Sequence, residues 1–121
     1  MEYRMLGKTG LSVSSVGLGC WTMAGMHGAA GWPGVDDKES IATIHHAESL
    51  GVNLLDTAEG YGLGHSEEII GEALRARRHR YVIATKGSPV TDDPDEVKAR
   101  RRIEKACEGS LRRLQTDYID V

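Results

Sequence analysis

A carboxylate, a phenol and an ammonium group each follow, directly or within a few residues, the end of a short apolar segment of this chain. Asp56 follows an apolar segment at 52–55, and Tyr61 lies in the loop just beyond it. Lys86 follows a second apolar segment at 82–85. In parallel α/β folds, side chains at the carboxyl ends of neighbouring strands converge on one pocket. Such a group of side chains could transfer a proton.

The chemistry of such a site depends on the phenol. A phenol has a pKa of about 10, so by itself it is a poor proton donor at neutral pH. A nearby ammonium stabilises the phenolate, and a carboxylate holds the ammonium in place. Tyr61 could then protonate a carbonyl oxygen while another group delivers hydride to the carbon. The alternative is that Asp56 and Lys86 form an ordinary buried ion pair and that Tyr61 only packs in its loop.

Strand and helix signals alternate along the chain and would position these groups. A hairpin is predicted from strands at 4–6 and 11–13. Further strands are predicted at 15–19, 52–55, 81–85 and from 118 onward, and helices at 36–50, 66–78 and 93–114. A repeat of about 30 residues or more suits parallel strands joined by helical crossovers. The pattern therefore predicts an α/β fold, either a (β/α) barrel or an open doubly wound sheet.

The helix boundaries carry their own signals. Asp36 and Glu39 have the spacing of a capping box, and Gly51 would end the first helix. Ser66 is expected to cap the second helix, with Glu67 in its first turn. The helix residues expected to face the core are Ile41, Ile44, Ala47, Leu50, Ile69, Ile70, Ala73, Leu74, Ile103, Ala106, Ser110, Leu111 and Leu114.

A glycine pair in the last part of the predicted strand at 15–19 invites comparison with dinucleotide-binding loops. Gly17 and Gly19 have the spacing of the first two glycines of such a loop, but Thr22 stands where the third is required. The next helix also begins too late for its amino terminus to reach a pyrophosphate. The glycines instead indicate a strand that leaves room for a neighbouring group.

Composition bounds the class of protein. Of the 121 residues, 40% are apolar and 27% charged, with a net charge of -3, as in a globular protein with no general affinity for nucleic acid or membranes. No apolar stretch approaches the roughly 20 residues that span a bilayer, and no signal peptide is evident at the amino terminus. Cys20 and Cys107 are far apart, which indicates reduced thiols in a cytoplasmic protein without a metal site.

Several motifs together resemble the aldo-keto reductase family. They are Asp-Thr-Ala-Glu-Gly-Tyr-Gly at 56–62, Gly-His-Ser-Glu-Glu-Ile-Ile-Gly-Glu-Ala-Leu at 64–74, Val-Ile-Ala-Thr-Lys at 82–86, Ser-Leu-Arg-Arg-Leu at 110–114, Thr-Asp-Tyr-Ile-Asp at 116–120, and the segments 6–14 and 17–19. The similarity runs from residue 3 to residue 121. It is greatest to the bacterial branch that acts on small carbonyls and sugars.

The resemblance implies a (β/α)8 barrel that reduces aldehydes and ketones with NADP(H). It implies that Tyr61 is the general acid, that Lys86 eases the ionisation of this phenol, and that Asp56 holds Lys86. Asp56 would also lie at the nicotinamide ribose. Cys20 and Trp21 match positions beside the nicotinamide and the substrate, so these two residues and Asp56 are the expected cofactor-binding residues.

The same resemblance implies that only part of the barrel is present. Residues 1–121 correspond to its amino-terminal portion, a partial TIM barrel of a hairpin and about three and a half βα units. The family's catalytic histidine and most of its cofactor site would follow Val121, and Gln115 replaces a common glycine. Three interpretations stay open: the first part of a reductase, expected to be inactive alone; a non-catalytic remnant or binding module; and a half-barrel completed by a second chain.

An incomplete barrel has consequences for partners. Unpaired strand edges and an open interior favour association, so a complementary chain or a homo-oligomer is expected besides a small carbonyl substrate. The strand residues Val16, Leu54, Ile83 and Ile119 are candidates for the exposed interior surface.

Overall fold

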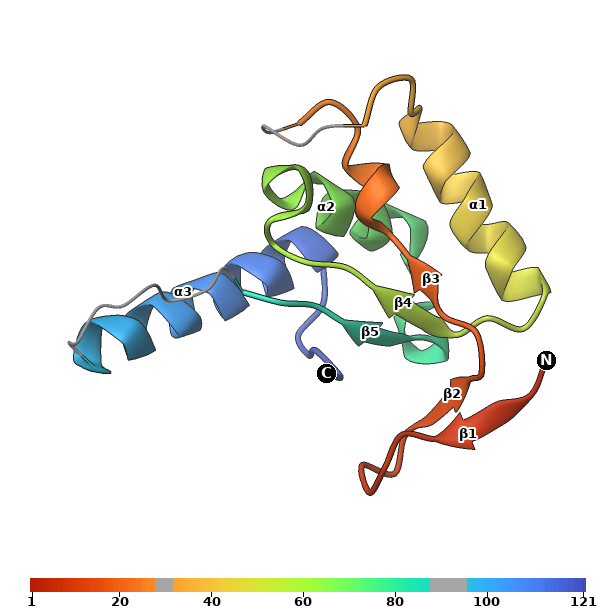
Figure 1. Cartoon of the computed structure of the whole chain (residues 1–121), viewed down its shortest axis with the longest axis horizontal. Coiled ribbons are helices and arrows are strands. Elements are labelled where there is room, and N and C mark those ends of the chain that lie inside the picture. Colours follow the sequence, from red (N-terminus) through yellow and green to blue (C-terminus); the bar gives the residue numbers. More distant parts are fainter. Residues whose placement is uncertain (28–31, 88–95) are drawn as a thin grey trace.

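The computed structural model describes residues 1–27, 32–87 and 96–121. Its strands are β1 (Tyr3–Met5), β2 (Ser12–Ser14), β3 (Leu18–Gly19), β4 (Leu54–Asp56) and β5 (Val82–Ala84). Its helices are α1 (Asp37–Ser49), α2 (His65–Ala73) and α3 (Glu96–Leu114), with short 3-10 turns η1 (Trp21–Ala24), η2 (Tyr61–Gly64) and η3 (Arg78–Arg80) (Figure 1). None of these helices is both long and apolar enough to span a membrane.

The predicted hairpin is confirmed, and it lies at the end of the molecule where the parallel strands begin (Figure 1). Asn53, just before β4, fixes it there. The Asn53 amide donates to the carbonyl of Ser12 at 2.9 Å and accepts from the backbone N–H of Ser14 at 2.7 Å. The Tyr3 hydroxyl adds a bond to the carbonyl of Gly51 at 2.8 Å. The opposite end of the sheet is therefore left free of the hairpin.

The second sheet is parallel, with strand order β3–β4–β5. Leu55 of β4 pairs with Leu18 on one side and with Ile83 on the other. Beside β5, the N–H of Val121 donates to the carbonyl of Ile83 and the N–H of Thr85 donates to the carbonyl of Val121, each at 3.2 Å. These two bonds have the parallel pattern, so the predicted fourth strand is represented by the pairing of Val121, while residues 118–120, where it was predicted to begin, form no strand. The structure is thus a partial (β/α) barrel, as expected, and the sheet does not close in the described residues.

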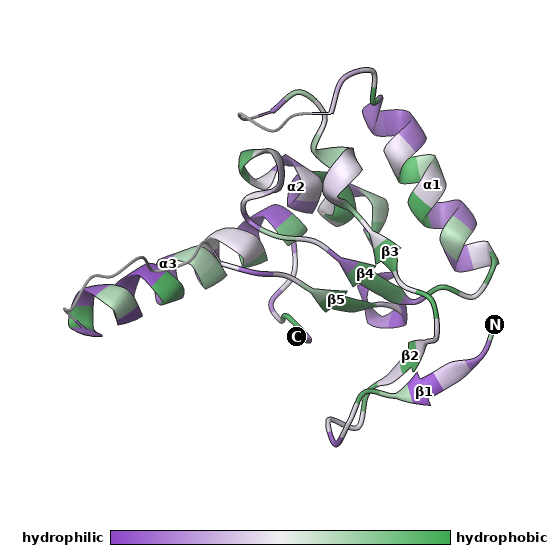
Figure 2. Ribbon diagram, viewed as in Figure 1, coloured by the Kyte–Doolittle hydropathy of each residue, from purple (hydrophilic) through white to green (hydrophobic). Residues whose placement is uncertain are grey.

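The core lies between the sheet and the helices that cover one face of it. It consists of Cys20, Met23, Ile44, Leu55, Ile69, Ile70, Ala73, Leu74, Tyr81, Ile83 and Leu114. Figure 2 shows the apolar colour concentrated on β4 and β5, between the helices and the open side. Ile83 is fully buried in this core, so its assignment to the exposed interior was wrong. Val16 is exposed as expected, and Leu54 and Ile119 are half-buried.

Two helix residues expected in the core are exposed instead. Leu50 lies one residue beyond the last turn of α1, where the chain turns toward β4, and its side chain faces solvent. Ile103 lies on α3 and lines a groove between this helix and the edge of β5, where its side chain stays 61% exposed. The predicted start of this helix at Asp93 lies outside the described residues.

The predicted cap residue is correct for helix α1 and wrong for helix α2. The carboxylate of Asp36 accepts from the backbone N–H groups of Lys38 and Glu39, which confirms it as the cap of α1. Helix α2 begins earlier than predicted, with Gly64 at the capping position in a left-handed conformation (φ 96°). The assignment of Ser66 as cap was wrong, because its hydroxyl is buried and bonded elsewhere.

Helix α2 and the end of α3 pack backbone against backbone. A Cβ atom at Gly71 would lie 2.4 Å from the carbonyl oxygen of Arg113, so only glycine allows this approach. Gln115, which directly follows the last residue of α3, has a positive φ of 53°. That left-handed conformation favours glycine, which accounts for the glycine that the family resemblance implies here.

The segment after α3 is fastened to the start of β5 by an arginine. Arg78 donates to the Asp120 carboxylate at 2.6 Å, and its guanidinium lies 4.0 Å from the centre of the Tyr118 ring. The same carboxylate oxygen accepts from the N–H of Ile83 at 2.9 Å. These contacts fix where the fourth strand begins along β5. Arg78 itself is largely buried in this arrangement.

Candidate active site

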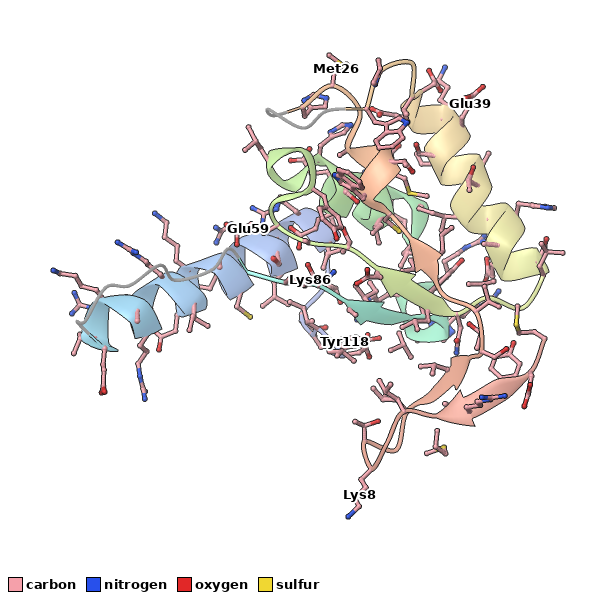
Figure 3. The ribbon with its side chains drawn as sticks, viewed as in Figure 1. Lys8, Met26, Glu39, Glu59, Lys86 and Tyr118 are labelled. Atoms are coloured by element: carbon pink, nitrogen blue, oxygen red, sulfur yellow. The ribbon has the colours of Figure 1, made fainter. Side chains whose placement is uncertain are left out.

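The structure brings Asp56 and Lys86 together at the carboxyl end of the parallel strands. Asp56 pairs with Ala84 in the sheet, and Lys86 lies two residues further on, so both side chains leave the same face. The Lys86 Nζ donates to Asp56 Oδ1 at 2.5 Å and to the carbonyl of Thr57 at 2.7 Å. Figure 3 shows Lys86 beyond the end of β5, away from Lys8 at the hairpin tip.

Tyr61 is held near this pair by the loop between β4 and α2. The Lys86 Nζ lies 5.2 Å from the centre of the Tyr61 ring. The loop is joined to the segment after β5 by the N–H of Glu59, which donates to the carbonyl of Lys86 at 3.0 Å (Figure 3). The N–H of Tyr61 donates to the carbonyl of Ala58, which closes a tight turn. The three groups predicted from strand ends therefore share one site.

The environment of Lys86 favours its charged form. Burial opposes the charge, but the hydrogen bond and negative charge of Asp56, with a smaller effect of Tyr61, raise the pKa of Lys86 above its ordinary value. The Lys86 side chain is therefore protonated at neutral pH, and it loses its proton only at a pH above the ordinary pKa of lysine. Both side chains of the pair are about half exposed (51% and 50%), so the pair contributes little to stability.

Aromatic side chains form one wall of the site. Trp21 lies 6.4 Å from Tyr61 between ring centres, and Trp32 meets Trp21 edge-on at 5.3 Å. Trp21 and Trp32 are both nearly half exposed, so a planar group could contact them. Trp21 and Asp56 thus present accessible surface where a cofactor is expected.

Cys20 differs from the other expected cofactor-binding residues. Its side chain is completely buried, and its thiol donates to the carbonyl of Leu18 at 3.5 Å. Burial, reinforced by the charge of Asp56 and opposed by Lys86, raises the pKa of the Cys20 thiol to about 12. Its peptide N–H donates to the carbonyl of Asp56 at 2.8 Å, which ties the end of β3 to the end of β4.

The two cysteines should therefore differ sharply in reactivity. We expect a thiol reagent such as DTNB at pH 8 to modify the exposed Cys107 at least about 100 times faster than Cys20, because a pKa near 12 leaves Cys20 about a thousandfold less thiolate than an ordinary thiol. The absorbance of the released thiol measures both rates. A Cys107→Ser variant isolates Cys20, and urea should make Cys20 reactive. Rapid modification of Cys20 in the folded variant would contradict its burial.

His65 follows the Tyr61 loop in the sequence, but its side chain contacts residues other than Asp56, Tyr61 and Lys86. Its Nε2 lies 2.9 Å from Asp37 Oδ1, its Nδ1 lies 3.5 Å from Glu68 Oε2, and its ring stacks on His27 at 4.0 Å. This arrangement joins the starts of α1 and α2 at the rim of the site. Within residues 1–27, 32–87 and 96–121, no three side chains of His, Cys, Asp or Glu form a metal-binding group.

Sequence reasoning missed a buried polar layer beneath the site. Ser66 and Glu67 are both fully buried, and Glu67 forms an ion pair with Arg113 at 2.7 Å. The one sign of this layer in the sequence is that a glutamate at 67 and an arginine at 113 have opposite charges. Because charged residues on helices usually face solvent, that sign does not predict a buried pair. The pairing depends on how α2 and α3 pack, which local sequence does not show.

Comparison with known proteins gives the family. The sequence profile described as "Aldo/keto reductase family" matches residues 15–121, which is most of the chain. The chain belongs to the aldo/keto reductase family. The resemblance seen in the motifs, and the partial barrel that it implied, are confirmed.

The relatives of this aldo/keto reductase chain are longer proteins. It is 42% identical over 125 residues to the aldo-keto reductase YhdN of Bacillus subtilis, covering all of this chain and 37% of that protein. The holo form of the aldo-keto reductase AKR11C1 from Bacillus halodurans superposes with a TM-score of 0.77 at 36% identity, over 98% of this chain and 38% of that one. An aldo-keto reductase from Klebsiella pneumoniae in complex with NADPH superposes with a TM-score of 0.71 at 35% identity, over 89% and 34%.

Proposed function

We propose that this chain carries the proton-donating part of an NADPH-dependent carbonyl reductase. The observation that supports it is the Lys86 ammonium, held by Asp56 and by the carbonyl of Thr57 beside the ring of Tyr61 at the open end of the sheet. The substrate class that suits a positioned phenol is an aldehyde or ketone, whose oxygen takes a proton as the carbon is reduced.

Each residue of the site has a separate role in the proposed reduction of a carbonyl. The Tyr61 hydroxyl donates its proton to the carbonyl oxygen of the substrate. The positive charge of Lys86 stabilises the phenolate that this leaves on Tyr61. Asp56 keeps the ammonium protonated and in place. Trp21 and Trp32 limit the access of water on one side of the reacting carbonyl.

The accessible groups fit a nicotinamide cofactor in part. The half-exposed carboxylate of Asp56 can accept hydrogen bonds from ribose hydroxyls, and the indole of Trp21 offers a flat surface. When bound, NADPH supplies hydride to the substrate carbon. The expected contact with Cys20 stays a prediction, since only its peptide group lies beside Asp56 and its thiol is buried.

A test of this function requires a complete barrel. The chain spans 37% of the length of its Bacillus subtilis relative, so we propose that residues 1–121 alone turn over slowly or not at all. A chimera joining residues 1–121 to the remaining part of that relative supplies the other strands. We expect it to oxidise NADPH with simple aldehydes, followed at 340 nm. A folded chimera that binds NADPH but reduces no aldehyde or ketone would argue for the alternative of a non-catalytic binding module.

The open side of the sheet also predicts how the chain behaves by itself. Ile103, Cys107, Ile119 and Val121 line a groove of about 430 Å³ between α3 and the edge of β5. Exposed strand edges and apolar grooves favour association. We propose that a polypeptide carrying the remaining barrel strands, or a second copy of this chain, covers this groove.

Sedimentation at micromolar concentration should accordingly show self-association of the 121-residue chain, with binding of an apolar dye such as ANS. Adding a separate chain with the remaining strands of the Bacillus subtilis relative should raise the midpoint of thermal unfolding and suppress dye binding. A compact monomer with cooperative unfolding and no dye binding would count against this proposal.

A further inference from the structure

Two consecutive residues on the first turn of α2 lie directly beneath the catalytic group. Ser66 and Glu67 are fully buried, although serine and glutamate usually face solvent. A buried polar group is costly unless it is hydrogen-bonded. Both residues have hydrogen-bond partners, and these partners are at the ends of the strands that carry the active site.

Ser66 acts on the acceptor of the Lys86 ammonium. Its hydroxyl donates to the carbonyl of Cys20 at 2.8 Å, at the end of β3. Because a hydroxyl has one hydrogen to give, Ser66 must accept in its second contact, from the hydroxyl of Thr57 at 2.9 Å. The N–H of Thr57 donates to the carbonyl of Ala84. Thr57 is thus fixed at its side chain and its N–H, and its carbonyl is the one that accepts from Lys86.

Glu67 acts on the backbone next to Lys86. Its Oε1 accepts from the hydroxyl of Thr85 at 2.6 Å, and its Oε2 accepts from Arg113 Nε at 2.7 Å. Thr85 immediately precedes Lys86, and its N–H donates to Val121 at the start of the fourth strand. The carboxylate therefore joins the end of β5 to α3 through two short bonds.

We propose that Ser66 and Glu67 are positioning residues for Lys86. Ser66 orients the Thr57 carbonyl that binds the ammonium, while Glu67 fixes the backbone that carries the lysine. Together they keep the ammonium against Asp56 and Tyr61 instead of letting it move freely in water. The significance for catalysis rests on the proposed reductase function, but the effect on Lys86 exists without it.

The experiment follows the titration of Lys86 itself. The 121-residue chain is labelled with 13C-lysine, the Lys86 Cε signal is assigned with Lys86→Arg, and its chemical shift is recorded against pH. In the unaltered chain we expect Lys86 to titrate above the ordinary value of a lysine side chain. Ser66→Ala and Thr85→Val should each shift this midpoint down toward that ordinary value. Asp56→Asn gives the size of the full effect, and Thr85→Ser, which keeps the hydroxyl, should restore the midpoint.

Ser14→Ala is the matched control. The Ser14 hydroxyl is also buried, donates to the carbonyl of Val16 at 2.7 Å and accepts from the N–H of Asn53 at 3.1 Å, but at the hairpin end of the sheet. The Ser14→Ala substitution should lower the free energy of unfolding about as much as Ser66→Ala does, and it should leave the Lys86 midpoint unchanged.

Several results would overturn the proposal. They are a Lys86 that titrates at the ordinary value of lysine in the unaltered chain, an unchanged midpoint in either Ser66→Ala or Thr85→Val, or an equal shift in Ser14→Ala. Loss of far-UV circular dichroism in both site variants but not in Ser14→Ala would show a role in folding alone. The titration needs neither cofactor nor turnover, so a chimera that fails to reduce carbonyls would leave this result intact.

Discussion

Tyr61→Phe should lower kcat of the chimeric reductase by about 10² to 10⁴, the usual contribution of a positioned general acid. Phenylalanine keeps the ring that lies 5.2 Å from Lys86 Nζ and 6.4 Å from Trp21, but it has no proton to give. Binding of NADPH should change little, because the substitution removes only the hydroxyl. Initial rates at saturating cofactor, together with NADPH affinity by fluorescence, separate these two quantities.

Tyr118→Phe is the matched control for this result. Tyr118 is partly exposed, and its ring packs against Arg78 at the opposite end of the sheet. Its hydroxyl has no place in the proposed chemistry, so kcat should stay within about twofold of the unaltered chimera. Equal losses in the two variants, or full activity of Tyr61→Phe, would remove Tyr61 as the proton donor.

Arg113→Leu should destabilise the folded chimera by about 3–5 kcal/mol, the usual cost of breaking a buried ion pair from one side. Among residues 1–27, 32–87 and 96–121, the substitution leaves the Glu67 carboxylate, which has no exposed surface, with the Thr85 hydroxyl as its remaining side-chain partner. It also removes the guanidinium and arginine stem that lie against Gly64. Urea unfolding followed by circular dichroism gives the free energy of unfolding.

Two comparisons identify the cause of that loss. Arg112→Leu changes the neighbouring exposed arginine and should cost less than about 0.5 kcal/mol. The double variant Glu67→Met with Arg113→Leu removes both charges and should regain a large part of the loss, because no unpaired carboxylate is then buried. A double variant as unstable as the sum of its two single variants would show that the two charges do not stabilise each other.

The sequence by itself determined the element types and the family. Turn residues at 7–10 predict the hairpin, and the spacing of strand ends predicts parallel pairing, because helical crossovers need about 30 residues. The same spacing placed Asp56 and Lys86 at one end of the sheet, since residues that follow parallel strands leave at the same edge. The motif at 56–62, together with those at 64–74, 82–86 and 110–120 and the segments 6–14 and 17–19, indicates the family.

The sequence misplaced residues wherever packing outweighed local signals. Ser66 has the type and position of a helix cap, yet its hydroxyl is used by Cys20 and Thr57. Ile103 fits the apolar stripe of its helix, but it lines an open groove beside β5 and its side chain is exposed. What covers a side chain depends on residues distant in sequence, and a periodic pattern carries no information about them.

Only the tertiary structure decided how Lys86 is held. Asp56 as its partner could be foreseen, but the Thr57 carbonyl, the Ser66 hydroxyl and the buried Glu67 carboxylate come together only when α2 packs across three strand ends. Glu67 can be buried because Arg113 reaches it from α3, and Arg113 reaches it because Gly71 lets the two helices touch. Local sequence determines which segments form strands and helices, whereas burial of a charge depends on distant groups that compensate for its lost hydration.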